Sequence, residues 1–223
     1  SKENVEFTKL GKLIEERKLK FLHNNKRIEL DIDHFRDIWF KTSFLLDSEQ
    51  TNMDECKSRF LNYKNQKLKY KFPNSFTGKI KKGSYKKNII AAVIREKGIN
   101  SEREMAYMLH LSGFEVKDVH MTDLVSGKEN LENVNMVVFP GGFSNSDVLG
   151  SAKGWAGAFK YNEREKKAIN QFYSRSNTVS LGVCNGCQLM MELNLIDKKL
   201  NGNHPKMEHN NSKKFECTFS GID

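Results

Sequence analysis

The chain has 223 residues, of which 38% are hydrophobic and 29% charged, a composition that allows a buried core in one large domain or two small ones. No stretch approaches the roughly 20 apolar residues of a transmembrane helix, and the polar start has no apolar segment of a secretory signal. Four scattered cysteines do not form a disulfide framework. We therefore expect free thiols, a cytoplasmic location and no membrane association.

The formal charge of +9 is confined to the first part of the chain. Residues 1–87 contain 21 basic and 12 acidic side chains, whereas residues 88–223 contain 16 of each. Eleven basic residues and no acidic one lie between Lys57 and Lys87, a pattern that would suit phosphate or nucleic acid. A solvated linker, or a surface that faces an acidic neighbour, is the interpretation we prefer. We therefore expect no nucleic-acid partner.

Two short elements are predicted before this basic segment. Residues 26–32 alternate like a strand, and residues 33–44 have apolar side chains at helical spacing, with Asp33 as the expected N-cap. Such a piece is too small and too basic to form a core of its own, so we expect it to be the end of a larger domain. Prolines and glycines among the lysines of residues 63–87 indicate a loop or linker.

From residue 88 onward, predicted strands and helices alternate at regular spacing. Two of the predicted strands, residues 89–94 and 134–139, contain continuous apolar runs, which are typical of strands buried on both faces. The predicted strands cover residues 89–94, 114–119, 134–139 and 178–183, and the helices cover residues 102–112, 163–172 and 185–195. Ser101 and Glu104 form a predicted capping box. The alternation indicates an α/β domain with a doubly wound, mostly parallel sheet, preceded by a small α+β tail.

Two of the predicted strands end in residues that suggest chemistry. Gly182-Val183-Cys184-Asn185-Gly186 has the pattern of a nucleophile elbow with cysteine in place of serine. Cys184 would begin a helix whose dipole favours the thiolate, and the N–H of Asn185 would face an oxyanion. Paired glycines follow the third strand, and Gly142 is the expected second oxyanion donor.

Other roles for this cysteine are open at this stage. A buried cysteine is more often a packing residue than a nucleophile, and Cys184 with Cys187 resembles a redox or metal pair. A metal site would need a second ligand pair, which the sequence lacks, and a thioredoxin-like pair follows the first strand of its fold rather than the fourth. The second glycine-bearing strand end favours the elbow, and Cys187 is then expected to pack or to line the site.

Residues 182–188 resemble the nucleophile motif of class I glutamine amidotransferases, whose sheet is flavodoxin-like. More narrowly, they resemble that of the phosphoribosylformylglycinamidine synthase family in its large single-chain form. Residues 101–106, 141–150 and 154–156 resemble the same family, and residues 34–44 resemble the end of its synthase domain. The resemblance implies three parts, namely a tail of the synthase domain (1–62), a basic linker (63–87) and an amidotransferase domain that lacks its C-terminal end (88–223).

The resemblance also implies a mechanism and partners. Cys184 would attack the side-chain amide of glutamine and release ammonia through a cysteinyl thioester, Gly142 and Asn185 would bind the oxyanion, and Gln188 would contact the bound glutamine. The ammonia would pass to the upstream synthase domain of the same polypeptide, which uses ATP and Mg²⁺ to amidate formylglycinamide ribonucleotide in purine biosynthesis. No cofactor or metal is expected in the part present here. The alternatives are a cysteine hydrolase or deglycase of the same fold, and a non-catalytic module that binds a partner domain.

The sequence departs from the family at the catalytic base. The family activates its cysteine with a histidine and a glutamate from a His-Pro-Glu-like motif, but His204-Pro205-Lys206 lacks the glutamate and follows Cys184 by only twenty residues. We expect the base to lie beyond Asp223, with His204 or His209 as the alternative. Residues 215–219 alternate like a strand, in which Cys217 is expected to pack.

Overall fold

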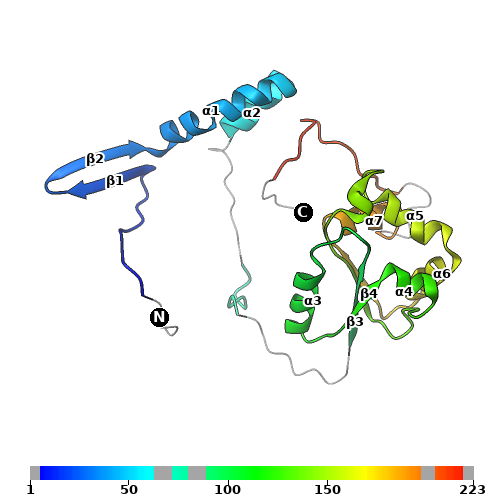
Figure 1. The fold of residues 1–223 in the computed structure, drawn as a ribbon. Coiled ribbons are helices and arrows are strands. Elements are labelled where there is room, and N and C mark those ends of the chain that lie inside the picture. Colours follow the sequence, from blue (N-terminus) through cyan, green and yellow to red (C-terminus); the bar gives the residue numbers. More distant parts are fainter. Residues whose placement is uncertain (1–5, 63–71, 80–88, 197–203, 218–223) are drawn as a thin grey trace. The chain divides into compact units, whose positions relative to one another are not determined.

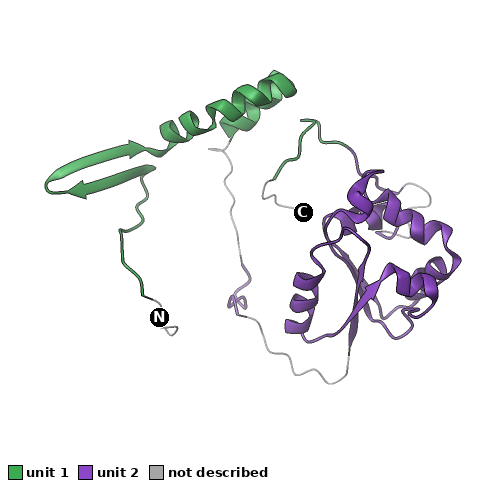
Figure 2. Ribbon diagram, in the orientation of Figure 1, with its two compact units in different colours: residues 1–71, 209–223 green, residues 72–208 purple. Residues whose placement is uncertain are grey.

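The computed structural model describes residues 6–62, 72–79, 89–196 and 204–217. Contacts divide the chain into two compact units, one of residues 1–71 with 209–223 and one of residues 72–208 (Figures 1 and 2). More than half of the basic segment from Lys57 to Lys87 lies outside the described residues, so its expected role as a linker stays a prediction. None of the helices in the described ranges is long and apolar enough to cross a membrane.

The first unit contains a hairpin followed by two helices. Strands β1 (Lys18–His23) and β2 (Lys26–Asp31) pair antiparallel, and helices α1 (Ile32–Gln50) and α2 (Met53–Leu61) follow. The predicted N-cap was wrong by two residues. Asp31 caps α1 by accepting a hydrogen bond from the His34 N–H at 2.8 Å, because β2 runs directly into the helix and Asp31 keeps the extended backbone that a cap needs. Asp33 pairs with Arg17 instead.

This unit buries very little apolar surface, as its composition predicted. Among its described residues Cys56 is the single buried hydrophobic side chain, whereas Trp39 on α1 is 81% exposed. A polar cluster centred on Asp47 joins residues distant in sequence, since Asp47 contacts Arg59 on α2 at 2.8 Å and Lys214 at 2.7 Å. Burial alone would raise the pKa of Asp47, but hydrogen bonds from Lys214, Arg59 and Thr51 outweigh it and hold that pKa well below its usual range.

The second unit is built on a four-stranded parallel sheet, which confirms the predicted α/β fold class. Its strands are β3 (Ile90–Arg95), β4 (Glu115–His120), β5 (Met136–Phe139) and β6 (Val179–Gly182), in the order β4-β3-β5-β6. β4 pairs with one edge of β3, and β5 pairs with the opposite edge, followed by β6. Ligands of such sheets bind at the carboxyl ends of the strands, near the point where the direction of winding changes.

Helices cover both faces of this sheet, as a doubly wound fold requires. The helices are α3 (Glu102–Leu111), α4 (Met121–Ser126), α5 (Lys153–Tyr161), α6 (Glu163–Ser174) and α7 (Asn185–Glu192). Alternate residues of each strand point to opposite faces. On β3, Ala91 and Val93 therefore pack with α3, whereas Ala92 and Ile94 belong to the larger core formed with α4 to α7.

Two expectations for the last residues do not hold in the part that the structure describes. No strand begins at Phe215, since residues 204–217 form neither helix nor strand, and residues 218 and 219 lie outside the described ranges. Cys217 is exposed rather than packed, so the alternation of Phe215 and Cys217 does not place either side chain in a core.

One side chain in the core of the second unit is ionisable. Glu165 on α6 is 0% exposed, and neither carboxylate oxygen has a hydrogen-bond partner among the described residues. Burial, assisted by the nearby charge of Glu96, raises the pKa of Glu165 to about 7 from its ordinary value of 4.5. The folded state therefore holds this proton more tightly than the unfolded chain, so the contribution of Glu165 to stability is greatest below pH 4.5 and is lost as the pH rises through 7.

We expect Glu165→Gln to remove this decline, because glutamine keeps the shape and carries no charge. At pH 8 the variant should exceed the wild type in unfolding free energy by about 2–3 kcal/mol, and the gain should vanish as the pH falls below about 4. Urea unfolding across this pH range measures the difference. Glu163→Gln, on the exposed side of the same helix, is the control and should stay within about 0.5 kcal/mol of the wild type. Parallel pH curves for wild type and Glu165→Gln would contradict the prediction.

Candidate active site

Cys184 lies on a sharp turn between β6 and α7, at the carboxyl edge of the sheet. Its backbone angles, φ 51° and ψ −112°, fall in a region that non-glycine residues rarely adopt, and its side chain is exposed. Strain of this kind costs about 1–3 kcal/mol and persists where the surrounding structure imposes it. A cysteine held exposed on a strained strand-to-helix turn has the geometry of a nucleophile elbow, as the sequence predicted.

Gly186 explains why the elbow pattern requires a glycine after the nucleophile. A Cβ atom at this position would lie 1.9 Å from the carbonyl oxygen of Phe139, the last residue of β5. The first turn of α7 therefore lies directly against the backbone of the neighbouring strand, which leaves no room for a side chain. This contact fixes where the helix begins, and so fixes Cys184 above the end of β5.

The paired glycines after β5 form the second loop of the site. Gly142, with φ 148°, bridges Ile99 in the loop after β3, and a Cβ atom on Gly142 would lie 2.7 Å from the Cα of Ile99. The two hydrogen bonds of this bridge run from the Phe143 N–H to Gly98 at 2.9 Å and from the Asn100 N–H to Gly141 at 3.4 Å. In this pattern the N–H of Gly142 itself points away from Ile99.

Two backbone N–H groups at the site thus have no acceptor in the described ranges. One belongs to Gly142, and the other belongs to Asn185, the first residue of α7, where a helix leaves its N–H groups unpaired. Unpaired N–H groups beside a nucleophile are what an oxyanion site requires.

The structure brings all four predicted site residues together. A Cβ atom on Gly141 would lie 3.1 Å from the Cβ of Cys184, so the glycine loop and the elbow are in contact. The side-chain oxygen of Asn185 accepts hydrogen bonds from the N–H and the hydroxyl of Ser144, at 3.1 and 2.6 Å. The amide nitrogen of Asn185 donates to Oε1 of Gln188 at 3.0 Å. Cys187, three residues beyond the nucleophile, is half-buried in the same helix.

Two serines that support the site were not recognised in the sequence. Ser101 was expected to cap α3, but its side chain makes no capping bond and its hydroxyl donates to the carbonyl of Gly141 at 2.9 Å. Ser144 is 1% exposed and bonds to Asn185, 41 residues away. Both lie within the stretches that resemble the amidotransferase family. Their partners, however, are set by the tertiary structure.

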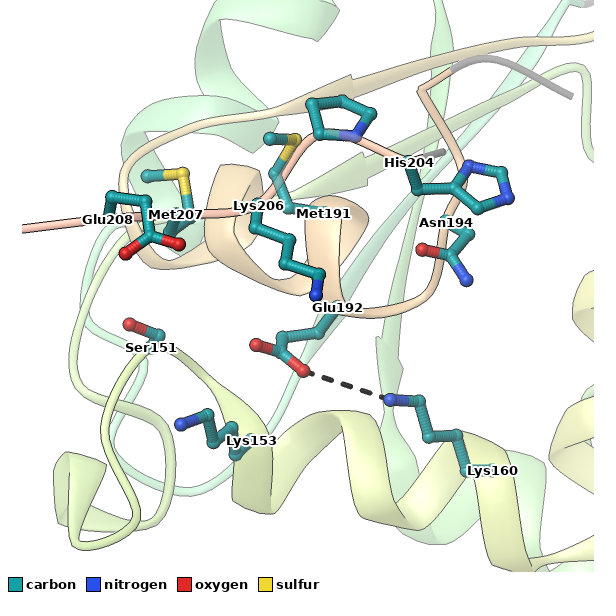
Figure 3. Close-up of a pocket in the computed structure, with 11 residues that line it drawn as sticks. Ser151, Lys153, Lys160, Met191, Glu192, Asn194, His204, Lys206, Met207 and Glu208 are labelled. Carbon is teal, nitrogen blue, oxygen red and sulfur yellow. Dashed lines mark ion pairs between the residues drawn. The ribbon is translucent and has the colours of Figure 1, made fainter. Parts of the chain in front are cut away.

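His204 lies near the end of α7 that is far from Cys184, a position that does not favour it as the catalytic base. It lines a cavity of about 440 Å³ together with Met191, Glu192 and Asn194, at the C-terminal end of α7 (Figure 3). With a rise of 1.5 Å per residue, that end of the helix is about 12 Å from Cys184. The cavity carries its own polar contacts, such as the pair of Lys160 and Glu192 at 3.7 Å. His209 belongs to the other unit.

A parallel sheet with helices on both faces, an elbow cysteine and a glycine-paired loop beside it are the features of an α/β domain with a candidate cysteine nucleophile. Residues 88–222 match the family described as CobB/CobQ-like glutamine amidotransferase domain. This match covers more than half of the chain, and the chain belongs to that family.

Three curated relatives carry the name phosphoribosylformylglycinamidine synthase, in one case preceded by "probable". The protein of Arabidopsis thaliana, designated chloroplastic/mitochondrial, is 39% identical over 197 residues, that of Dictyostelium discoideum 42% over 195 and that of Drosophila melanogaster 37% over 190. The alignments cover 82–84% of this chain and 14% of each relative, so the chain spans about one seventh of their length. A solved structure of PurLQS from Thermotoga maritima is 24% identical, with a TM-score of 0.41 over 50% of this chain and 47% of that one.

Proposed function

We propose that this chain is the glutaminase part of a phosphoribosylformylglycinamidine synthase. The observation that carries the proposal is the position of Cys184, exposed on a strained elbow beside two backbone N–H groups without acceptors in the described ranges. The names of the curated relatives support the identity of the whole enzyme, of which this chain would supply the ammonia.

The proposed chemistry proceeds through a covalent intermediate on Cys184. The thiolate attacks the carbonyl carbon of the glutamine side-chain amide, and the N–H groups of Gly142 and Asn185 bind the oxyanion of the tetrahedral intermediate. The carbon–nitrogen bond then breaks, the nitrogen takes up a proton and leaves as ammonia, and a glutamyl thioester remains. Water hydrolyses this thioester to glutamate and returns the thiolate.

Gln188 is proposed to contact the bound glutamine. Its Oε1 already accepts from Asn185, which leaves its own amide N–H groups as donors without an acceptor among the described residues. A donor of this kind suits a carbonyl or carboxylate oxygen of the substrate. Recognition of glutamine would thus rest on the first turn of the helix that also carries the nucleophile.

The remainder of the proposal concerns parts beyond the amidotransferase domain (88–223). The alignments with the relatives are longer than the family match and so extend upstream of residue 88, which supports residues 1–62 as the tail of a synthase domain, joined by the linker 63–87. The exposed apolar residues of α1 support the same view. ATP and Mg²⁺ would be bound by that synthase domain, and the free thiols suit a reducing compartment such as the cytoplasm.

A glutamine-like electrophile should modify Cys184 in preference to the other three cysteines. A diazo-ketone analogue of glutamine requires both a reactive thiol and a glutamine site, whereas iodoacetamide requires only an accessible thiol. We expect the analogue to label Cys184 at least about 10-fold faster than Cys217, although both are exposed. Cys56 should resist both reagents, because burial raises the pKa of its thiol. Peptide mapping by mass spectrometry measures each site.

Competition separates the proposal from its alternatives. Free glutamine should protect Cys184 from the analogue, and Cys184→Ser should abolish the labelled peptide. Protection by a glycated or carbonyl substrate but not by glutamine would favour a hydrolase or deglycase. Labelling of Cys184 and Cys217 at equal rates, without protection by glutamine, would favour a non-catalytic module and overturn the proposal.

A further inference from the structure

The side chain of Asn185 is the buried link between the two loops of the candidate active site. It is 2% exposed, and both ends of its amide are used, the oxygen by Ser144 and the nitrogen by Gln188. Resting on the proposed function, we infer that Asn185 is a positioning residue, which aligns the two oxyanion donors and orients Gln188 toward glutamine. Its backbone N–H would bind the oxyanion, and its side chain would align the other groups that act in the attack on glutamine.

The oxygen end of the amide fixes the glycine loop relative to the helix. Ser144 donates twice to this one oxygen, through its N–H at 3.1 Å and its hydroxyl at 2.6 Å, and Ser144 is itself buried. On its other side the loop is held by the bonds of Gly141 and Phe143 to the loop after β3. Gly142 belongs to the short loop that both sets of bonds hold, so its N–H keeps one position relative to the N–H of Asn185.

The nitrogen end of the amide fixes the orientation of Gln188. Because Asn185 donates to Oε1 at 3.0 Å, the Gln188 side chain cannot turn this oxygen toward the substrate without losing the bond. Its N–H groups are then the part presented to a ligand. Hydrogen bonds among buried groups are stronger than those in water, so the bonds of Asn185 to Ser144 and Gln188 favour one arrangement of these side chains.

The test compares two labelling rates of Cys184 in the whole chain. The rate with the diazo-ketone glutamine analogue depends on the aligned site, and the rate with iodoacetamide at the same pH depends on the thiolate alone. The ratio of the two rates removes changes in thiol ionisation. Asn185→Leu removes both ends of the link, Asn185→Asp keeps the acceptor for Ser144 but loses the donor to Gln188, and Ser144→Ala removes only the hydroxyl bond. Ser112→Ala is the control, since its hydroxyl donates at 2.8 Å to Met108 on α3.

We expect the ratio to fall about 10- to 100-fold in Asn185→Leu and several-fold in Asn185→Asp and Ser144→Ala, and to stay at the wild-type value in Ser112→Ala. The double variant of Asn185→Leu with Ser144→Ala should be no worse than Asn185→Leu, because the two changes break the same link. A wild-type ratio in Ser144→Ala and Asn185→Asp would overturn the inference, even if Asn185→Leu failed to fold. A wild-type chain that the analogue does not label would instead refute the proposed function.

Discussion

We expect the 223-residue chain to release ammonia from glutamine about 10³- to 10⁶-fold more slowly than a complete amidotransferase, since the members of a catalytic unit act together. A thiolate alone can attack the amide. Turnover also needs an acid that protonates the departing ammonia and a base that activates the water for thioester hydrolysis. Within the second unit, the described residues place no histidine beside Cys184 to do either.

The positions of the histidines of the second unit support this expectation. His204 is at the far end of α7, and His110 is on α3, which packs against the other face of the sheet. His120 ends β4, and its ring contacts Thr122 at 2.9 Å. Three strand spacings of about 4.8 Å separate β4 from β6, so His120 is roughly 14 Å away from the elbow.

The measurement is ammonia release by a coupled assay, together with mass spectrometry of the thioester. We expect slow formation of a glutamyl adduct on Cys184 with little ammonia in later turnovers, and no adduct in Cys184→Ala. A longer chain that carries a His-Pro-Glu-like segment should restore turnover. An ordinary enzymic rate from the 223-residue chain would show that a base is already present, and His204→Ala and His120→Ala would then be the first variants to examine.

The strands of the parallel sheet and the elbow were predictable because each has a local signal. Continuous apolar runs identified the buried strands β3 and β5, and the glycine spacing around Cys184 identified the turn. Helix α5 had no such signal. It contains Gly154 and Gly157, and its N-cap Ala152 makes no side-chain capping bond. Tertiary packing stabilises this helix, since Trp155 is fully buried and its ring lies edge-on to that of Phe139, with 5.9 Å between the ring centroids.

The contacts that align the site were not predictable, because they join residues distant in sequence. The local pattern at Ser101 favoured a capping box. In the fold its side chain makes no capping bond, and its hydroxyl donates to the carbonyl of Gly141. Likewise, nothing in the neighbourhood of Ser144 indicates that it meets Asn185. The candidate site residues could therefore be predicted from the sequence, whereas the contacts that hold them together required the fold.

Gly186→Ala should strongly destabilise the second unit. The added methyl group would meet three atoms of Phe139, with the carbonyl oxygen at 1.9 Å, the carbonyl carbon at 2.5 Å and Cβ at 2.8 Å. Two of these are backbone atoms of a buried central strand, which cannot move without breaking the pairing of β5 with β6. We expect a loss of more than about 4 kcal/mol in unfolding free energy, which a marginally stable domain does not survive.

Gly157→Ala is a matched control, because it also adds one methyl group to a helical glycine. The nearest atom to that methyl group would be Cδ2 of Tyr161 at 3.9 Å, an ordinary contact. Alanine in a helix interior is favoured over glycine by about 0.5–1 kcal/mol, so this variant should be slightly more stable than the wild type. Urea unfolding of both variants measures the contrast. Near wild-type stability in Gly186→Ala would mean that α7 does not lie against β5, and the elbow geometry of Cys184 would lose its structural cause.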